Sequence, residues 1–296
     1  MATPQLGQHY DTLRNYVKMV TRGYSNMLVL DADGGLGKTH TVCDVLESEQ
    51  GIDTWTHKVG YTTPVELYKT LWQARGSDDV LFLDDMSGIT SSTKAVDMMK
   101  SATDTQGDRN WVEYQTSQAI DHPTKLHMEL PNEFCFRGSI IMSFNDTPDN
   151  PHFDALVDRG TYYNLSFDYQ ERIDIIHELA KSRDFSDLSI SSQQQVAEWI
   201  ESVTNPAYDV TIRTFEEVCN MYHFARHEDA NWKKLAVEVF DIDYEKYLII
   251  DMRQNSDESI EQQIGAWCEE TGLSETAYYD RWSEIKQQYG SIDEVS

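Results

Sequence analysis

Residues 27–39 constrain the fold of this chain more than any other stretch. They read Met-Leu-Val-Leu-Asp-Ala-Asp-Gly-Gly-Leu-Gly-Lys-Thr. The apolar run at 27–30 predicts a buried strand. A glycine-rich turn follows, and Lys38 and Thr39 open a helix that continues through Val42. This order of strand, loop and helix is the one that a phosphate-binding loop requires.

The residue types in this loop suit phosphate chemistry. Glycines let the backbone curl so that its N–H groups point at phosphate oxygens, and a helix N-terminus adds partial positive charge. Lys38 is expected to reach the β- and γ-phosphates, and the Thr39 hydroxyl to hold Mg²⁺. The motif has glycine six positions before the lysine, where this chain has Ala32, which adds one methyl group. The alternative is a chance glycine-rich turn. The expected nucleotide-contacting residues are Ala32, Asp33, Gly34, Gly35, Leu36, Gly37, Lys38, Thr39 and His40.

A second nucleotide motif is predicted at residues 80–85. Four apolar residues, Val-Leu-Phe-Leu, are followed by Asp84 and Asp85. A strand buried on both faces reads as continuously apolar, and its carboxyl end delivers side chains to the ligand crevice of a parallel sheet. The stretch resembles a Walker B motif. Asp84 is expected to bind Mg²⁺, and Asp85 to orient or deprotonate the attacking water. The plainer interpretation is an acidic strand end.

The remaining periodicity predicts an α/β core followed by helices. A helix beginning at Thr63 and Pro64 has the expected N-terminal signals. After Gln170 only helices are predicted. The other expected helices lie at 9–22 and 93–102, and the other expected strands at 54–59, 111–116, 138–144 and 162–167.

The acidic composition bears on habitat and partners. The chain has 296 residues, of which 40% are apolar, so a packed core with smaller modules is expected. Its net charge of −27 is spread along the whole chain. An even acidic coat suggests adaptation to molar salt and a haloarchaeal cell, plasmid or virus, and an ordinary acidic cytosolic protein is the alternative. A broad basic face for nucleic acid is excluded, so DNA contact would be local or within an assembly.

The cysteines and the hydropathy indicate a reducing, cytoplasmic setting. Cys43, Cys135, Cys219 and Cys268 are far apart and form no CxxC pair, so free thiols are expected. No apolar stretch approaches the roughly 18 residues of a membrane span, and the polar N-terminus lacks the apolar core of a signal peptide. We therefore expect a cytoplasmic protein that contacts no membrane.

Taken together, these motifs resemble those of AAA+ ATPases. The phosphate loop, Asp84-Asp85, Asn145 and the run Ala-Leu-Val-Asp-Arg at 155–159 occur in that family's order. The resemblance covers roughly residues 10–230, and small AAA-type ATPases of phages, plasmids and archaeal viruses are similar. It implies a P-loop core with a parallel sheet flanked by helices, an all-helical lid, and ATP and Mg²⁺ as cofactors.

The resemblance also implies roles for three residues. Asn145 would be sensor 1, which holds the attacking water, or alternatively a turn residue. Arg159 would be an arginine finger serving a neighbouring subunit of a ring or spiral homo-oligomer, or alternatively a partner of Asp154 or Asp158. Arg213, in the first turn of a lid helix capped by Thr211, would be a second sensor, or alternatively structural. The catalytic set is thus Lys38, Asp85, Asn145 and Arg159.

Residues 256–290 predict two helices separated by a tight turn. Ile260, Ile264 and Trp267 form one stripe, Gly272 is expected to end that helix in a left-handed conformation, and Ser274 can cap the next. This is the pattern of a helix-turn-helix. The expected divisions are 1–182 for the core, 183–250 for the lid and 251–296 for this module.

The second helix of this module is the candidate DNA-contacting helix. Its expected face also carries acids that phosphates would repel, so a helical hairpin for protein contacts is the alternative. The face comprises Thr276, Tyr279, Arg281, Lys286 and Gln287, and the acids are Glu275, Asp280 and Glu284.

Three function classes remain open. The leading hypothesis is Mg²⁺-dependent ATP hydrolysis by an oligomeric AAA+ ATPase of a virus or mobile element. It would act on DNA or on a DNA-bound partner, as initiators and helicase loaders do, and archaeal origin-binding proteins have a similar order of modules. The alternatives are a protein-remodelling or virion-assembly ATPase with a protein client, and a nucleotide-gated switch with little turnover. Nucleotide kinases fit less well, since they would not explain Asn145 and Arg159.

Overall fold

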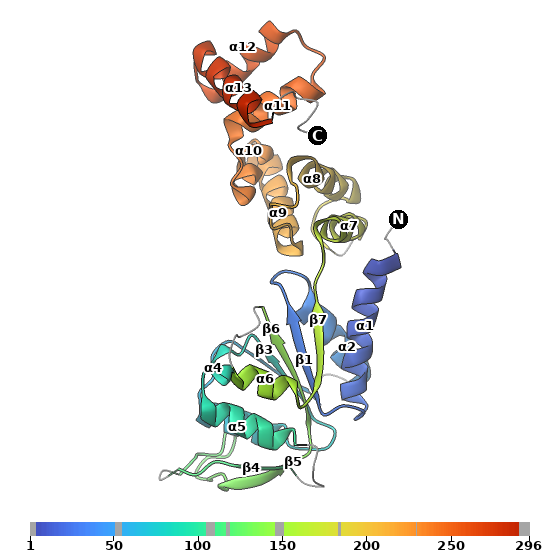
Figure 1. The fold of residues 1–296 in the computed structure, drawn as a ribbon, viewed down its shortest axis with the longest axis vertical. Coiled ribbons are helices and arrows are strands. Elements are labelled where there is room, and N and C mark those ends of the chain that lie inside the picture. Colours follow the sequence, from blue (N-terminus) through green and yellow to red (C-terminus); the bar gives the residue numbers. More distant parts are fainter. Residues whose placement is uncertain are drawn as a thin grey trace. The chain divides into compact units, whose positions relative to one another are not determined.

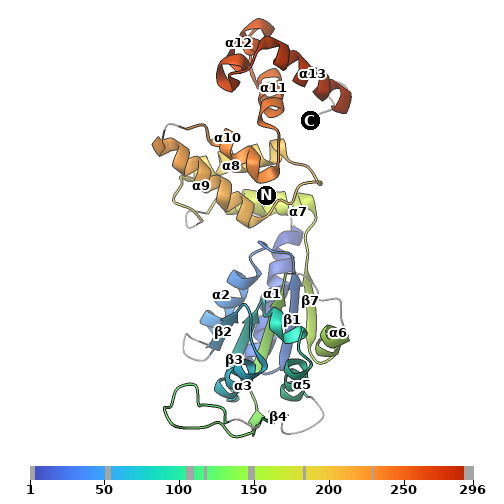
Figure 2. The ribbon, with the colours of Figure 1, turned by 90° about the vertical axis from the view of Figure 1, so that its left-hand side faces the viewer.

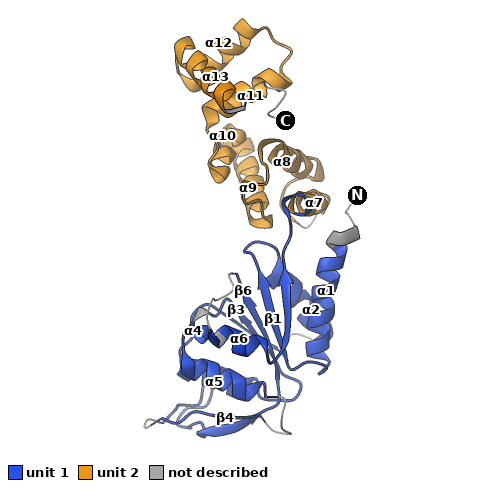
Figure 3. Cartoon of the chain, viewed as in Figure 1, with its two compact units in different colours: residues 1–171 blue, residues 172–296 orange. Residues whose placement is uncertain are grey.

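A computed structural model describes most of the chain as two compact units. They comprise residues 1–171 and 172–296 (Figure 3). The expected finer division of the chain at 182 and 250 stays a prediction. The described residues are 4–50, 55–104, 110–116, 119–145, 151–182, 185–228 and 230–289.

The first unit is built on a five-stranded sheet in which every neighbouring pair is parallel (Figure 1). The strand order is β2-β3-β6-β1-β7. Every residue of β1 and β3 is buried, as the continuous apolar runs predicted, because helices cover both faces. The predicted fold class, a parallel α/β P-loop core followed by helices, is confirmed. The strands are β1 (Met27–Ala32), β2 (Trp55–Val59), β3 (Val80–Asp84), β6 (Ser139–Phe144) and β7 (Thr161–Leu165).

Two groups of helices enclose this sheet (Figures 1 and 2). Apolar side chains of α3, α5 and α6 join one buried cluster with Val29, Leu83 and Met142 of the sheet. Helices α1 and α2 pack against each other, and α1 contacts β1, β6 and β7. The helices are α1 (Pro4–Thr21), α2 (Lys38–Gln50), α3 (Pro64–Gln73), α4 (Ser87–Thr90), α5 (Thr93–Ala102) and α6 (Pro151–Val157).

Local sequence signals set where these helices begin. The Thr63 hydroxyl accepts the backbone N–H of Glu66 at 3.3 Å, and Pro64 occupies the first helical turn of α3. Similarly, the Ser92 hydroxyl accepts the N–H of Ala95 at 3.4 Å at the start of α5. Both contacts satisfy N–H groups that have no partner within a helix, which is why the sequence located these starts correctly.

The expected strand at 111–116 belongs to a separate sheet. In the structure β4 (Asn110–Glu113) pairs antiparallel with β5 (Glu133–Phe136), which was not predicted. Beyond the ladder, the Tyr114 N–H donates to the Asn132 carbonyl at 2.9 Å. The hairpin buries Val112 and Phe136 but leaves Trp111 49% exposed. This insertion lies outside the five-stranded sheet and contributes nothing to its edge.

The second unit is helical throughout its described residues, as predicted. Its last three helices enclose a small core in which Trp267 and Tyr278 meet edge to face, with ring centroids 5.4 Å apart. None of the described helices in the chain has the length and apolar character needed to cross a membrane. The helices from residue 169 onward are α7 (Tyr169–Leu179), α8 (Ile190–Val203), α9 (Ile212–Glu228), α10 (Trp232–Ala236), the short 3₁₀ helix η1 (Val237–Phe240), α11 (Tyr244–Asn255), α12 (Ile260–Thr271) and α13 (Glu275–Tyr289).

The expected two-helix module is present as α12 and α13. Ser259 and Gln262 form a reciprocal capping box at the start of α12. Gly272 ends that helix with φ of 72° and donates its N–H to the Cys268 carbonyl at 2.9 Å. The Ser274 hydroxyl accepts the Ala277 N–H at 3.4 Å. A positive φ at Gly272 is the conformation that the sequence predicted for this turn.

Candidate nucleotide site

The glycine-rich turn connects the carboxyl end of β1 to the first residue of α2. Gly35 and Gly37 have φ of 76° and 73°, a left-handed conformation that side chains disfavour. Ala32 is buried and Asp33 is exposed. The Leu36 carbonyl accepts the Tyr10 hydroxyl of α1 at 2.8 Å. This contact ties the turn to α1, and burial raises the pKa of Tyr10 to about 12.

Lys38 lies at the centre of the polar contacts. Its side chain is 5% exposed, and its Nζ donates to the Ala32 carbonyl at 3.2 Å. Nζ also donates to Oδ1 of Asn145, which follows β6. The Asn145 amide in turn donates to Oδ2 of Asp85. These two hydrogen bonds connect the start of α2 with the ends of β6 and β3 at the carboxyl edge of the sheet.

Asp84 forms the second polar group at this edge. Its Oδ1 accepts the hydroxyl of Ser143, and its Oδ2 accepts the Thr39 hydroxyl at 2.8 Å. The next residue, Asp85, has φ of 52°, and its N–H donates to the Ser143 carbonyl at 3.1 Å. A left-handed conformation at a residue with a side chain costs roughly 1–2 kcal/mol. In this backbone conformation the Asp85 carboxylate accepts the hydrogen bond from the Asn145 amide.

The donors present suit a hard divalent cation and a phosphate chain. Within the described residues, no group of three or more His, Cys, Asp or Glu side chains is placed to hold a metal ion. Thr39 and Asp84 offer a cation two oxygen ligands, which phosphate and water oxygens would supplement, and oxygen ligands are those that Mg²⁺ prefers. The turn itself, with the N-terminus of α2, presents backbone N–H groups for phosphate.

Arg159 is not brought together with these residues. It stands immediately before β7, whose first residue, Thr161, pairs with Leu28 near the start of β1. The nucleotide loop leaves the other end of β1, so the two lie at opposite edges of the sheet, roughly 16 Å apart along strands of this length. Within the chain, Arg159 Nη1 donates to the Lys100 carbonyl at 3.2 Å.

The other two predicted contact residues, His40 and Arg213, have exposed side chains. His40 is exposed on α2, with Nε2 at 3.4 Å from Asp44 Oδ2. Arg213 is exposed in the first turn of α9, and the Thr211 hydroxyl caps that helix by accepting the Thr214 N–H at 3.1 Å. Because Arg213 belongs to the second unit, its role toward the nucleotide stays a prediction.

Sequence reasoning missed two residues at this edge. Ser143 is a polar residue inside the apolar run of β6, which is a signal that the sequence does contain. His57 lies in β2, and its Nε2 stands 3.5 Å from Asp84 Oδ2. No local pattern identifies His57, because its proximity to Asp84 depends on the pairing of β2 with β3.

Two of the four thiols, those of Cys43 and Cys219, have surroundings that keep them protonated. All four cysteines are free, and Cys219 is buried. Burial, with the nearby Asp84 carboxylate as a lesser cause, raises the pKa of the Cys43 thiol to about 11. Burial likewise raises the pKa of Cys219 to about 12. Protonated thiols are poor nucleophiles, so neither Cys43 nor Cys219 is a candidate thiolate.

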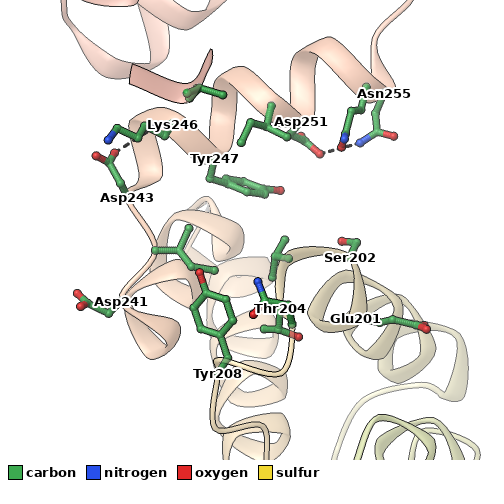
Figure 4. A pocket seen from close by; sticks show the side chains of 16 residues that line it. Glu201, Ser202, Thr204, Tyr208, Asp241, Asp243, Lys246, Tyr247, Asp251 and Asn255 are labelled. Atoms are coloured by element: carbon green, nitrogen blue, oxygen red, sulfur yellow. Dashed lines mark hydrogen bonds between the residues drawn. The ribbon is translucent and has the colours of Figure 1, made fainter. Parts of the chain in front are cut away.

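A second cavity, of about 870 Å³, lies within the helical unit (Figure 4). Tyr208 and Tyr247 line it together with several acids. Asp243 caps α11 by accepting the N–H groups of Glu245 and Lys246 at 3.0 and 3.2 Å. Asp251 accepts the Asn255 amide at 3.0 Å. These polar groups are engaged in holding the helices, and they present no reactive arrangement.

The candidate DNA-contacting face on α13 is less basic than its sequence suggested. Arg281 Nε donates to Glu245 Oε2 at 2.7 Å, and its Nη1 is 3.6 Å from Glu284. Lys246 pairs with Glu284 at 2.9 Å, and the hydrogen bond from Lys246 lowers the pKa of Glu284. Lys286 lies over the Trp282 ring at 4.9 Å. Thr276, Tyr279, Lys286 and Gln287 remain exposed.

Comparisons with known proteins place this geometry in context. No family model matches the chain. The chain is 25% identical over 241 residues to an uncharacterized 36.7 kDa protein in the nrdC-mobD intergenic region of Enterobacteria phage T4, which covers 75% of this chain and 71% of the phage protein.

Two solved structures are similar at low identity. A mutant of Thermotoga maritima RuvB superposes with a TM-score of 0.47 and 15% identity over 96% of this chain and 88% of that chain. The Thermotoga maritima RuvB Holliday junction branch migration motor gives a TM-score of 0.46 and 15% identity over 96% and 87%. Superpositions at this level assign no role to the chain. The fold rests on its own strand order, and a haloarchaeal origin receives no support from these relatives.

Proposed function

We propose that the protein is a Mg²⁺-dependent ATPase of the AAA+ type that works as a homo-oligomer. The observation that carries this proposal is the convergence of Lys38, Thr39, Asp84, Asp85 and Asn145 at the carboxyl edge of a parallel sheet. Ligands bind at this edge in open α/β sheets. The residues come from the ends of β3 and β6 and from the start of α2, so the fold itself holds them in position.

Each side chain has a defined task in this proposal. The loop N–H groups and Lys38 bind the phosphates, and Thr39 and Asp84 hold Mg²⁺, which supplies charge neutralisation on the β- and γ-phosphates. Asp85 accepts a proton from the attacking water, and Asn145 orients that water. Lys38 is hydrogen-bonded to Asn145. A γ-phosphate that attracts Lys38 would therefore release Asn145 for the water.

Arg159 acts in this proposal on the site of a neighbouring subunit. Its place at the opposite edge of the sheet prevents it from reaching the site of its own chain. A guanidinium keeps its charge at all relevant pH values and matches phosphate oxygens in a fork. The site would then be complete only in a ring or spiral, and hydrolysis would require assembly.

We further propose that the protein serves a virus or mobile element and acts on DNA or on a DNA-bound partner. The phage T4 relative supports the first part, and the α12–α13 module supports the second. The ion pairs of Arg281 reduce the cationic surface of that module. The side chains left to contact DNA are Thr276, Tyr279, Lys286 and Gln287. Adaptation to molar salt remains part of this proposal through the net charge of −27.

A specific observation also favours a nucleotide-gated switch with little turnover. Asp85 is one methylene shorter than the glutamate common at this position, and its carboxylate already accepts the Asn145 amide. A base engaged in this way would hydrolyse ATP slowly.

The test is phosphate release from ATP in molar KCl, with and without DNA. Turnover stimulated by DNA would support the leading proposal. Stimulation by a protein partner but not by DNA would support a protein-remodelling or virion-assembly ATPase. Nucleotide binding without turnover would support the switch. Absence of both binding and turnover in oligomeric protein would contradict all three.

A further inference from the structure

His57 is placed beside the proposed metal site by the register of the sheet. Strand β2 pairs with β3 so that His57 lies opposite Phe82 and Val59 lies opposite Asp84. Side chains two residues apart on a strand point to the same face, so His57, Phe82 and Asp84 share one face. The His57 ring stacks on Phe82 with centroids 4.6 Å apart and planes 6° apart. This stacking fixes the plane of the imidazole.

The nitrogen that faces Asp84 lacks a hydrogen bond. His57 Nε2 is buried and, within the described part of the chain, has no hydrogen-bond partner. It stands 3.5 Å from Asp84 Oδ2, the same oxygen that accepts the Thr39 hydroxyl at 2.8 Å. The other oxygen of Asp84 is engaged by Ser143. Burying a polar atom without a hydrogen-bond partner costs free energy, so the unpaired His57 Nε2 indicates that a ligand binds here.

The separations of His57 Nε2 and the Thr39 hydroxyl from Asp84 Oδ2 resemble those between ligands of one divalent metal. Two neighbouring ligands of an octahedral ion with bonds of about 2.1 Å lie roughly 3 Å apart, which is close to both separations from Asp84 Oδ2. An imidazole nitrogen suits Mn²⁺, Co²⁺ or Zn²⁺, whereas Mg²⁺ prefers oxygen ligands. A site with one imidazole, one carboxylate and one hydroxyl therefore does not select Mg²⁺ alone.

We propose that His57 Nε2 is a ligand of the nucleotide-associated metal, and that it gives this site a preference for Mn²⁺-like transition metals over Mg²⁺. The inference rests on the proposed nucleotide site, and it adds the identity of the metal that this site selects. In this arrangement Thr39, Asp84 and His57 supply the protein ligands, while Ser143 orients Asp84 from the side away from the metal.

The experiment is electron spin-echo spectroscopy of the full chain with Mn²⁺ and ADP. Wild type is expected to show coupling of Mn²⁺ to a coordinated imidazole ¹⁴N, and the pattern should change to that of ¹⁵N when histidine is labelled. His57→Gln should abolish the coupling and weaken Mn²⁺ binding about 10-fold, while Mg²⁺ binding measured by competition changes less than about 2-fold.

The matched control removes a different imidazole. His223 and His227 lie beside each other on α9 with ring centroids 4.8 Å apart, so a transition metal could meet two imidazoles there. His223→Gln is expected to leave the ¹⁴N coupling and the Mn²⁺ affinity intact. Loss of the coupling in His223→Gln, or its persistence in His57→Gln, would overturn the assignment.

Nucleotide binding is measured separately with a fluorescent ADP analogue. If wild type binds the analogue but its Mn²⁺ spectrum shows no imidazole coupling, His57 is not a ligand and the proposed function still stands. If the analogue does not bind in any salt condition, the proposed function itself fails. If His57→Gln does not fold, the absence of histidine coupling in the labelled wild-type spectrum would still overturn the assignment.

Discussion

The carboxyl edge of the sheet and the C-terminal helices both carry many charged side chains, but these have different surroundings. At the sheet edge, Lys38 and Asp84 are buried, 5% exposed each, and they contact neutral hydroxyl, amide and carbonyl groups. In the helices, Arg281 and Lys246 pair directly with Glu245 and Glu284 near the surface. At the sheet edge these charged groups have neutral hydrogen-bond partners, whereas the charged groups of the helices are paired with opposite charges.

This difference in the surroundings of the charged groups indicates which region is the candidate binding site. Burying a charged group is costly unless it is compensated, so a buried lysine held by an amide and a carbonyl indicates a function that requires it. Surface ion pairs contribute little to stability and indicate no ligand. The cavity of the helical unit resembles the second case, because its carboxylates cap a helix or pair with neighbouring side chains. The following predictions test that contrast, beginning with the largest effect.

Arg159→Ala is expected to reduce ATP turnover about 1,000-fold, since an arginine finger contributes at least that much. The measurement is phosphate release by the assembled protein. Mixing these subunits with Lys38→Ala subunits should restore part of the activity, because one supplies an intact site and the other an intact arginine. Arg137→Ala, which changes an exposed arginine of the same unit, is the control. No recovery at any mixing ratio would count against a role in the neighbouring subunit.

Asp85→Asn is expected to reduce turnover about 100-fold, since an amide cannot accept a proton from water. Nucleotide binding should persist, because Asp85 does not contact the loop. Asparagine tolerates the left-handed conformation of this residue better than most side chains do, so stability should change little. Single-turnover phosphate release measures the effect, with Asp97→Asn on α5 as the control. Equal turnover in wild type and Asp85→Asn would show that Asp85 is not the base.

Gly35→Ala should lower the free energy of unfolding by roughly 1–2 kcal/mol, because φ at this position is 76°. Gly34→Ala is the matched control. A Cβ there would meet only the Asn145 Oδ1 atom, at an ordinary 3.8 Å. Urea unfolding without nucleotide measures both. If the two variants were equally stable, the loop would not be held in this conformation before nucleotide binds.

The smallest expected effect concerns the ion pair of Lys246 with Glu284. The pKa of Glu284 is lowered in the folded protein, so the pair stabilises the fold above the ordinary carboxyl pKa of 4.5 and loses that contribution as pH falls through the lowered value. Lys246→Met should therefore shift the urea midpoint slightly at pH 7 and less at pH 3. Lys94→Met, an exposed lysine on α5, is the control. A larger shift at pH 3 would contradict the assigned pairing.

The sequence predicted what local patterns determine. The phosphate loop, Asp84, Asp85 and Asn145 all follow apolar strands, and strand ends meet at one edge of a parallel sheet regardless of strand order. The start of α3 and the end of α12 could also be predicted from local sequence, because Thr63 and Gly272 cap the helices next to them.

What the sequence did not reveal depends on distant pairings. His57 comes close to Asp84 only because β2 is the neighbour of β3, and strand order is not encoded in any short stretch. The pairing of β5 with β4 escaped prediction because its four residues show no distinct alternation. The sequence alone suggested that Arg281 is a cation available to DNA. Its ion pair with Glu245 could not be predicted, because the two residues are 36 positions apart. Electrostatic surfaces therefore need the structure, whereas the convergence of Lys38, Asp84, Asp85 and Asn145 at one edge of the sheet could be predicted without it.

The most direct test of the central claim is calorimetric titration of ATP and Mg²⁺ into wild type and Lys38→Ala in molar KCl. The buried ammonium at the loop predicts saturable binding to wild type with one nucleotide per chain. Removal of this charge-assisted contact should weaken binding at least about 100-fold. Equal affinity in the two proteins, or no binding by folded wild type, would contradict a nucleotide site at the carboxyl edge of the sheet.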